Sequence, residues 1–253
     1  MTTIAIDRPP VNAMSRAVVA ALESALDSLG TDTATRVAVL RGAGSRGLSA
    51  GADISEFPAL LEPSADTRGE GIQRLADRVE AFPKPLIVAI HGFCMGGALE
   101  IALACDIRIA AEDARIGLPE VRIGILPGGG GTQRLPRVVG PGRARLMIFS
   151  GEPISGRRAA EWGLVDEAVG PAEVFDRAAE IGRTLAAQSP YVLAVIKSLL
   201  RDTADAKLRD GLQTETAAFA RLLAHPDARE GIAAFLAKRQ ARWAPPAGGR
   251  TDA

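Results

Sequence analysis

Residues 89–135 read AIHGFCMGGALEIALACDIRIAAEDARIGLPEVRIGILPGGGGTQRL, and their pattern decides the fold. Three elements follow one another here: an apolar run from Leu86 to Ile90, a short helical stretch from Ala98 to Cys105 that Gly96 and Gly97 open, and a second apolar run from Ile107 to Ala111. A strand, a turn, a helix and a strand in this order favour βαβ units and a sheet covered by helices.

The same alternation extends toward the start of the chain. We predict an edge strand at Thr2–Ile6, a helix from the cap residue Ser15 to just before Gly30, a buried strand at Arg36–Leu40, a loop at Gly42–Ala52, a broken helical stretch at Asp53–Leu61, a mobile segment at Ser64–Gly69 and an amphipathic helix at Glu70–Phe82. Helices therefore alternate with strands over the whole N-terminal half.

Beyond Gly140 the pattern becomes mostly helical. Helices are predicted at 142–149, 156–162, 174–188, 190–202, 206–223 and 226–242, with a last strand at 164–169. The sequence divides into a core domain at 1–188, a helical region at 189–243 and a flexible tail at 244–253. The helical region has apolar faces that one chain does not need, which predicts contact with another subunit; its apolar residues include Leu208, Leu212, Phe219, Leu222 and Leu223.

Composition narrows the class of protein. Of 253 residues, 30 are Lys or Arg and 30 are Asp or Glu, without a dense basic run, so we expect no nucleic-acid partner. The N-terminus lacks the pattern of a signal peptide and no run of 18 apolar residues occurs, so we expect a cytoplasmic protein with no membrane contact. Cys94 and Cys105 fit no metal or disulfide spacing, which predicts two core residues and no metal.

Three residues around the central helix suggest chemistry. Gly97 lies at the helix start, where N–H groups without intrahelical partners can hold an oxyanion, and Glu100 lies on the same helix face three residues on. Glu120 follows Pro119 at the edge of the loop that leads into Gly128–Gly131. Either glutamate could be an ordinary solvated charge or cap, but the apolar neighbours of Glu100 predict burial, which is costly without a role. Two carboxylates and an oxyanion donor indicate acid–base chemistry at a polarised carbonyl.

Three other motifs compete with this interpretation. Gly42–Gly47 matches the dinucleotide fingerprint, but no long apolar helix follows it. Gly47–Gly51 matches the nucleophile elbow of hydrolases, with Ser49 and a later His225, but a loop separates it from the preceding strand. Gly128–Gly131 has no following lysine and is therefore not a P-loop; it predicts a turn that brings backbone close to another group.

The sequence as a whole resembles the crotonase, or enoyl-CoA hydratase/isomerase, superfamily. Three signatures carry the resemblance: SAGADI at 49–54, GGALE at 96–100 continuing to CDI at 105–107, and PE at 119–120 with PGGGGTQRL at 127–135. Further similarities are RPPVNA at 8–13, AAEWGLV at 159–165, and Glu230-Gly231 with Phe235, Lys238 and Arg239. Nearly the whole chain is covered in order.

The resemblance implies an α/β fold: a spiral of ββα units with two roughly perpendicular sheets and a C-terminal helical region that forms trimers or dimers of trimers. It also implies an acyl-CoA thioester substrate and no separate cofactor. The thioester oxygen would be held by the N–H groups of Ala52 and Gly97, an oxyanion hole that stabilises an enolate. Further substrate contacts are implied at Ala50, Asp53, Ile54, Gly128, Phe235 and Lys238.

Hydratases of this family have both glutamates, and so does this chain. By that resemblance Glu100 is the base that activates water for attack at C3 and Glu120 is the acid that protonates C2, which predicts a 2-enoyl-CoA hydratase. Family isomerases commonly keep only the carboxylate matching Glu120, so isomerisation stays an alternative, as do a non-catalytic acyl-CoA-binding subunit and a hydrolase. Ser55 replaces a lysine common in the family, so a phosphate contact would have to come from elsewhere, for which Arg8 is a candidate. The resemblance also implies an acyl pocket lined by residues from Ile54 to Ile72, the stretch in which family members differ most, so the sequence does not indicate the length or branching of the acyl chain.

Overall fold

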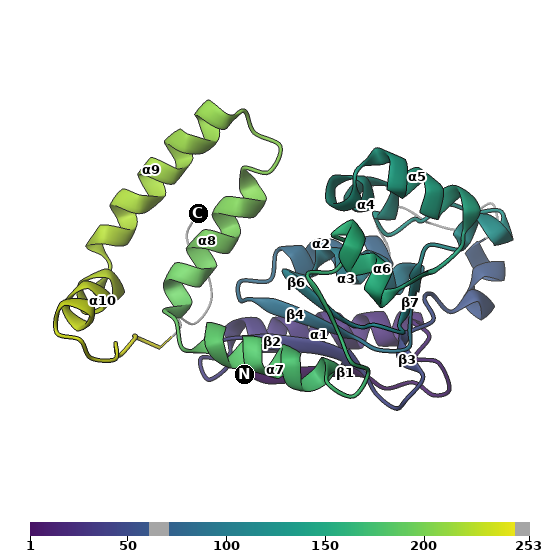
Figure 1. The fold of residues 1–253 in the computed structure, drawn as a ribbon, viewed down its shortest axis with the longest axis horizontal. Helices are drawn as coiled ribbons and strands as arrows, with labels where there is room; N and C mark the ends of the chain where they lie inside the picture. Colours follow the sequence, from purple (N-terminus) through teal and green to yellow (C-terminus); the bar gives the residue numbers. More distant parts are fainter. Residues whose placement is uncertain (61–70, 246–253) are drawn as a thin grey trace.

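The computed structural model describes residues 1–60 and 71–245, which form two sheets surrounded by helices (Figure 1). Three successive strand pairs supply six of the nine described strands in the two sheets. In each pair the first strand joins the larger sheet and the second joins the smaller one, so the chain steps between sheets as it spirals: β2 to β3, β4 to β5, β6 to β7. This is the predicted ββα spiral.

The elements have the following bounds. The strands are β1 (Thr2–Ile6), β2 (Ala38–Gly42), β3 (Gly47–Ser49), β4 (Leu86–Ile90), β5 (Phe93–Met95), β6 (Ile107–Ala111), β7 (Arg115–Gly117), β8 (Ile154–Ser155) and β9 (Glu167–Val169). The α-helices are α1 (Arg16–Thr31), α2 (Ile72–Glu80), α3 (Gly97–Ala104), α4 (Gly131–Val139), α5 (Pro141–Ser150), α6 (Gly156–Trp162), α7 (Val174–Ala186), α8 (Pro190–Asp202), α9 (Leu208–Ala224) and α10 (Pro226–Leu236), and two short 3₁₀ helices are η1 (Ile54–Leu60) and η2 (Glu120–Ile123).

The larger sheet has the order β1-β2-β4-β6-β9 and is parallel throughout. A parallel sheet is covered on both faces, which explains why all five residues of β4 are apolar and buried. Helices α1, α2 and α3 contribute to the main core on one face. On the other face, Val174 and Ala178 of α7 form a second apolar cluster with Ile87 and Ile109.

The smaller sheet has the order β3-β5-β7-β8, and its first three strands are parallel. The prediction of a loop over Gly42–Ala52 is wrong here, because β3 lies within it. The strands β5 and β7 were also not predicted from periodicity. Each of the three has only three residues, too few to display the alternation by which strands are detected in a sequence.

Gly42 lies where the chain leaves the larger sheet, and a Cβ there would approach the Gly47 carbonyl oxygen to 2.0 Å. Gly42→Ala is therefore expected to lower the free energy of unfolding by about 3 kcal/mol, because backbone cannot move aside as a side chain can. Urea denaturation checks this. Gly142→Ala is the matched control, since a Cβ at Gly142 meets nothing within 4 Å. Equal denaturation midpoints for the two variants would contradict the prediction.

The C-terminal helices α8, α9 and α10 stand apart from the two sheets (Figure 1). The strands predicted at Thr2–Ile6, Leu86–Ile90 and Ile107–Ala111 and the helices predicted at 156–162 and 190–202 are confirmed with their bounds. The segment Ser64–Gly69 and most of the tail 244–253 lie outside the described residues, so the expectations of mobility there are untested. In the described part, no helix is both long and apolar enough to span a bilayer.

Candidate active site

The carboxyl ends of β3, β5 and β7 bring together residues that are distant in the sequence. Parallel neighbouring strands end at the same edge of a sheet, and the loops that leave this edge are a common location for ligand sites. Ala52 follows β3, Gly97 follows β5, and Glu120 follows β7. The topology therefore gathers three of the four predicted catalytic and oxyanion positions at one edge.

Glycines allow these loops to touch. A Cβ at Gly51 would lie 2.7 Å from the carbonyl oxygen of Met95, and a Cβ at Gly96 would lie 2.9 Å from Oε1 of Glu120. Both glycines also have positive φ, +101° and +54°, which L side chains rarely adopt. Glycine is thus required at both positions, one beside each predicted oxyanion donor.

The N–H groups of Ala52 and Gly97 are free of backbone partners within the described residues. Ala52 forms a bridge with Met14, but the bonds of that bridge use the carbonyl of Gly51 and the N–H of Asp53, at 2.9 and 3.1 Å. Gly97 is the first residue of α3, where an N–H has no intrahelical acceptor. The two neighbouring loops therefore offer two main-chain donors without acceptors, as an oxyanion hole requires.

Glu100 lies in a helix that is buried on every side, as predicted, and is itself 3% exposed. Its Oε1 accepts two hydrogen bonds, from the N–H groups of Gly129 at 2.7 Å and Gly131 at 2.8 Å. Its Oε2 accepts none from the described residues. One oxygen is thus fixed by main chain, and the other is left to accept a proton.

Burial raises the pKa of Glu100, because a charged carboxylate loses hydration inside the protein. The N–H groups of Gly131 and Gly129 and the positive charge of Arg134 act in the opposite direction and lower the pKa. The glycine loop therefore helps a buried carboxyl to ionise.

Glu120 begins η2 directly after Pro119, and its Oε2 is buried without a hydrogen-bond partner in the described part of the chain. Burial and, to a smaller extent, the negative charge of Glu100 raise the pKa of Glu120 to about 7, against the lowering effect of a hydrogen bond from its own main-chain N–H. The two carboxyls are thus close enough to interact. Glu120 lacks the two N–H donors that stabilise ionised Glu100, so Glu120 is the group that keeps its proton near neutral pH.

The raised pKa of Glu120 predicts a change in stability with pH. The folded-state value of about 7 lies above the ordinary 4.5, so the folded protein loses stability as pH rises from 4.5 through 7, by about 3 kcal/mol. Glu120→Gln does not titrate and should unfold at a higher temperature than the parent at pH 8. At pH 4.5 this advantage should vanish. Thermal unfolding at both pH values checks this, and a constant difference would contradict it.

Of the predicted substrate-contact residues near β3, Ala50 and Asp53 lie in the loop that carries Ala52, and Ile54 begins η1. Asp53 pairs with Arg8 at 2.6 Å and accepts a hydrogen bond from the Ser55 hydroxyl at 2.6 Å, so its carboxylate holds the loop, and these partners lower its pKa. The N–H of Ala50 donates to Val11. Ile54 and Gly128 are exposed. Arg8, the candidate phosphate contact, is thus engaged with Asp53.

Phe235 and Lys238 are not brought to this edge. Phe235 lies on α10 and is 83% exposed, and Lys238 follows α10. Figure 1 shows α10 packed by α9, on the side of the molecule away from α4 and α5. Within one chain these two residues therefore lie apart from Glu100 and Glu120.

Sequence reasoning missed the partners of Glu100. Gly128–Gly131 was predicted as a turn that brings backbone close to another group, and that group proves to be the Glu100 carboxylate. The run of glycines was the available signal for this contact. Ile72 is the last residue of the stretch that the resemblance predicts to line the acyl pocket, and a Cβ added at Gly97 or at Gly129 would approach its side chain to 2.5 Å, so this residue lies beside the site.

The competing motifs have structural explanations. Ser49 is fully buried, and its Oγ accepts a hydrogen bond from the N–H of Gly51 at 3.0 Å, so it stabilises the loop after β3. His225 caps α10 and stacks on Tyr191 with ring centroids 3.7 Å apart. Cys94 and Cys105 are buried and unpaired, as predicted. No cluster of three potential metal ligands occurs among the described residues.

Comparison with known proteins decides the family. A family model described as enoyl-CoA hydratase/isomerase matches residues 1–246. The chain belongs to the enoyl-CoA hydratase/isomerase family. The resemblance of the signature motifs is thereby confirmed, and so is membership of a family of enzymes.

Individual members of the enoyl-CoA hydratase/isomerase family are similar over nearly their whole length. A probable enoyl-CoA hydratase of Bacillus subtilis is 44% identical over 96% of this chain and 95% of the relative. The 2,3-dehydroadipyl-CoA hydratase of Escherichia coli is 39% identical over 93% and 92%. The crystal structure of an enoyl-CoA hydratase from Bacillus anthracis matches with a TM-score of 0.91 at 37% identity, over 95% of this chain and 94% of that one. The predicted α/β fold is confirmed.

Proposed function

We propose that this protein is an enoyl-CoA hydratase, which adds water across the 2,3 double bond of a 2-enoyl-CoA thioester to give a 3-hydroxyacyl-CoA. The interacting carboxyls of buried Glu100 and half-buried Glu120, beside two main-chain N–H groups without acceptors in the described residues, carry this proposal. Relatives named as hydratases, at 44% and 39% identity, support the same activity. The substrate supplies the coenzyme A group, and carboxyls and main chain supply the chemistry, so we propose that no further cofactor takes part.

In this proposal the N–H groups of Ala52 and Gly97 hold the thioester oxygen. Attack of water at C3 of a conjugated thioester moves negative charge onto that oxygen as an enolate. Donors fixed in place before the reaction stabilise this charge more in the transition state than in the ground state. Their contribution is therefore to kcat.

Glu100 is the base and Glu120 is the acid. The free Oε2 of ionised Glu100 takes a proton from water as the oxygen attacks C3, while its Oε1 stays anchored by Gly129 and Gly131. Protonated Glu120 then delivers its proton to C2. This assignment of base and acid rests on two observations. Glu100 accepts hydrogen bonds from two N–H groups, whereas Oε2 of Glu120 is buried without a partner in the described residues and the pKa of Glu120 is about 7.

The deciding experiment incubates the protein with 2-enoyl-CoA esters of graded chain length and follows the loss of the conjugated thioester absorbance. Loss with formation of 3-hydroxyacyl-CoA supports the proposal and reports the preferred length. Interconversion of 3-enoyl- and 2-enoyl-CoA without water addition would identify an isomerase instead. Tight binding without turnover would identify an acyl-CoA-binding subunit, and release of free thiol that Ser49→Ala abolishes would identify a hydrolase.

We further propose a homotrimer or a dimer of trimers, assembled through the helical region 189–243, in the cytoplasm. Large apolar side chains on α9 and α10 are exposed in the single chain, among them Leu208, Phe219 and Phe235 at 79, 61 and 83%. Phe235 and Lys238 would reach a substrate only where α10 docks on another copy. Sedimentation equilibrium tests the assembly: a mass of one chain at micromolar concentration would refute it.

A further inference from the structure

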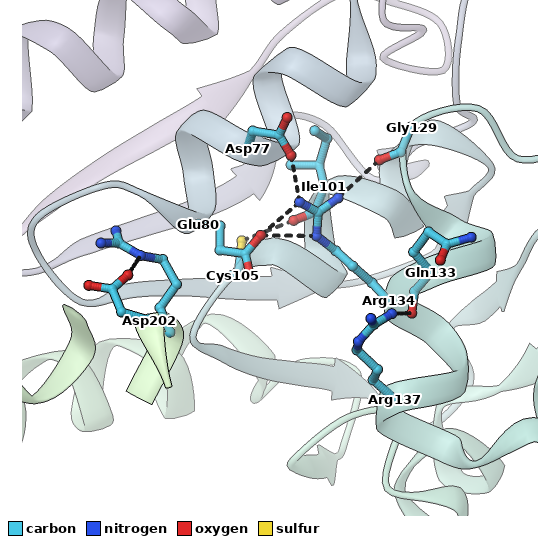
Figure 2. Close-up of polar contacts among 10 residues, drawn as sticks. Asp77, Glu80, Ile101, Cys105, Gly129, Gln133, Arg134, Arg137 and Asp202 are labelled. Atoms are coloured by element: carbon cyan, nitrogen blue, oxygen red, sulfur yellow. Dashed lines mark hydrogen bonds and ion pairs between the residues drawn. The ribbon is translucent and has the colours of Figure 1, made fainter. Parts of the chain in front are cut away.

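Arg134 links α4, the helix that carries it, to α2 and to Gly129 of the glycine loop, Gly128–Gly131 (Figure 2). Its Nη2 contacts the carboxylates of Asp77 at 2.8 Å and Glu80 at 2.7 Å, both on α2, and its Nε donates to Glu80 at 3.2 Å. Its Nη1 donates to the carbonyl oxygen of Gly129 at 3.3 Å. The side chain is only 17% exposed. A guanidinium is suited to this role because its planar fork serves several acceptors in fixed directions.

Gly129 forms hydrogen bonds with both Arg134 and Glu100. Its carbonyl accepts from Arg134, and its N–H donates to Oε1 of Glu100 at 2.7 Å. Gly130 has φ of +104°, and a Cβ there would lie 2.2 Å from Nη1 of Arg134. The glycine loop therefore wraps closely around the guanidinium, with its N–H groups turned toward Glu100.

Helix α2 contacts both Arg134 and the glycine loop. Asp77 and Glu80 lie on its last turns, while Ile72, its first residue, packs against both Gly97 and Gly129. The glycine loop is thus held to α2 in two ways: through Arg134, which pairs with α2 and donates to the Gly129 carbonyl, and by the apolar contact with Ile72. Both contacts act on the same Gly129 that anchors Glu100.

We propose that Arg134 is a positioning residue for Glu100: clamped by Asp77 and Glu80, it fixes the Gly129 carbonyl and so directs the glycine-loop N–H groups onto the carboxylate. The proposal rests on the proposed function, since it assigns Glu100 as the base. Arg134 does not touch the substrate in this arrangement. Its effect is on the orientation and ionisation of Glu100, so it should act on kcat and on the pH profile, with little effect on KM.

The test compares Arg134→Met with Arg137→Met on the same helix. Arg137 is 58% exposed and donates to the Gln133 carbonyl within α4 (Figure 2). It also pairs with Asp205 at 3.6 Å, and within the described residues it makes no polar contact with the glycine loop. We expect Arg134→Met to lower kcat about 10- to 100-fold, by analogy with the loss caused by removing groups that orient metal ligands. Arg137→Met should match the parent, and Arg134→Lys should recover part of the loss because it restores the charge without the fork.

The pH dependence of kcat distinguishes a positioning role from a purely structural one, because a purely structural role would leave it unchanged. The charged or titratable groups around Glu100 are Arg134 on α4 and Glu120 on η2, with Asp77 and Glu80 of α2 behind Arg134. Loss of the positive charge disfavours ionised Glu100, so the acidic limb of the kcat profile should shift to higher pH in Arg134→Met. An unchanged limb together with parent kcat would overturn the proposal.

A second measurement does not depend on turnover. In protein labelled with ¹⁵N-glycine, the amide signals of Gly129 and Gly131 should titrate with Glu100 in the parent and move to a higher midpoint in Arg134→Met. If that variant does not fold, Arg134→Gln is used in its place; it also removes the positive charge that lowers the pKa of Glu100 and should give a shift in the same direction. Parent-like midpoints in a folded variant would overturn this proposal even if hydration holds, whereas a parent protein without hydratase activity would refute only the proposed function.

Discussion

Replacing Glu100 by glutamine is expected to lower kcat for the hydration of crotonyl-CoA about 1,000-fold, with KM little changed, because general-base catalysis contributes on this scale. Glutamine is nearly isosteric, and its Oε1 can still accept from Gly129 and Gly131. The anchor is thus kept, while the oxygen that would take the proton becomes an NH₂ group. Steady-state kinetics on the purified variant check this result.

Glu112→Gln is the matched control, since Glu112 pairs with Arg157 at the surface at 2.8 Å. It should hydrate at the parent rate. Glu120→Gln should lower kcat by a similar order as Glu100→Gln. The double variant should be little worse than either single one, because the two groups act as a unit. Hydration at the parent rate by either single variant would refute the two-glutamate mechanism.

The sequence predicts those elements whose run or periodicity of apolar residues is long enough to be detected. The apolar run Leu86–Ile90 became the central strand β4 without adjustment, and the apolar surroundings of Glu100 correctly predicted a buried carboxylate. The strands β3, β5 and β7 were missed because three residues carry no period, yet their carboxyl ends position the site. The resemblance to a family, and not periodicity, predicted the second sheet.

The contacts around Glu100 could not be predicted from local sequence patterns, because they join residues that are distant in the sequence. Its anchors Gly129 and Gly131 lie 29 and 31 residues further along the chain. The glycine run predicted a close approach of backbone, but its partner depends on how α4 packs against α3, which no local propensity encodes. The Arg134 clamp also joins residues on two helices, 54 and 57 positions apart. In the sequence, Arg134 is one arginine among many.

Removal of one oxyanion-hole donor, the N–H of Gly97, is expected to cause the second large loss of kcat. Gly97→Pro is expected to lower kcat about 100- to 1,000-fold relative to Gly97→Ala, the usual effect of removing one oxyanion donor. Gly97 is the first residue of α3, the helical position where proline is best tolerated, and Gly96 before it has no Cβ to clash with the ring. The substitution therefore removes the N–H while the helix is retained.

Comparison with alanine at the same position separates the loss of the N–H donor from the effect of added side-chain volume. A Cβ at Gly97 would meet the ends of two flexible side chains, Ile72 Cδ1 at 2.5 Å and Met14 Cε at 3.1 Å, so both variants are made with Ile72→Ala to provide space. The variant with Ile72→Ala and Gly97→Ala should then keep a hydratase activity close to that of Ile72→Ala alone, and only the proline variant should fall far below this common reference. Binding of the product 3-hydroxybutyryl-CoA should change little in all three, because an enolate gains far more from the missing N–H than a ground-state thioester does. Equal kcat values for the alanine and proline variants would mean that the Gly97 N–H does not hold the oxygen at which charge develops.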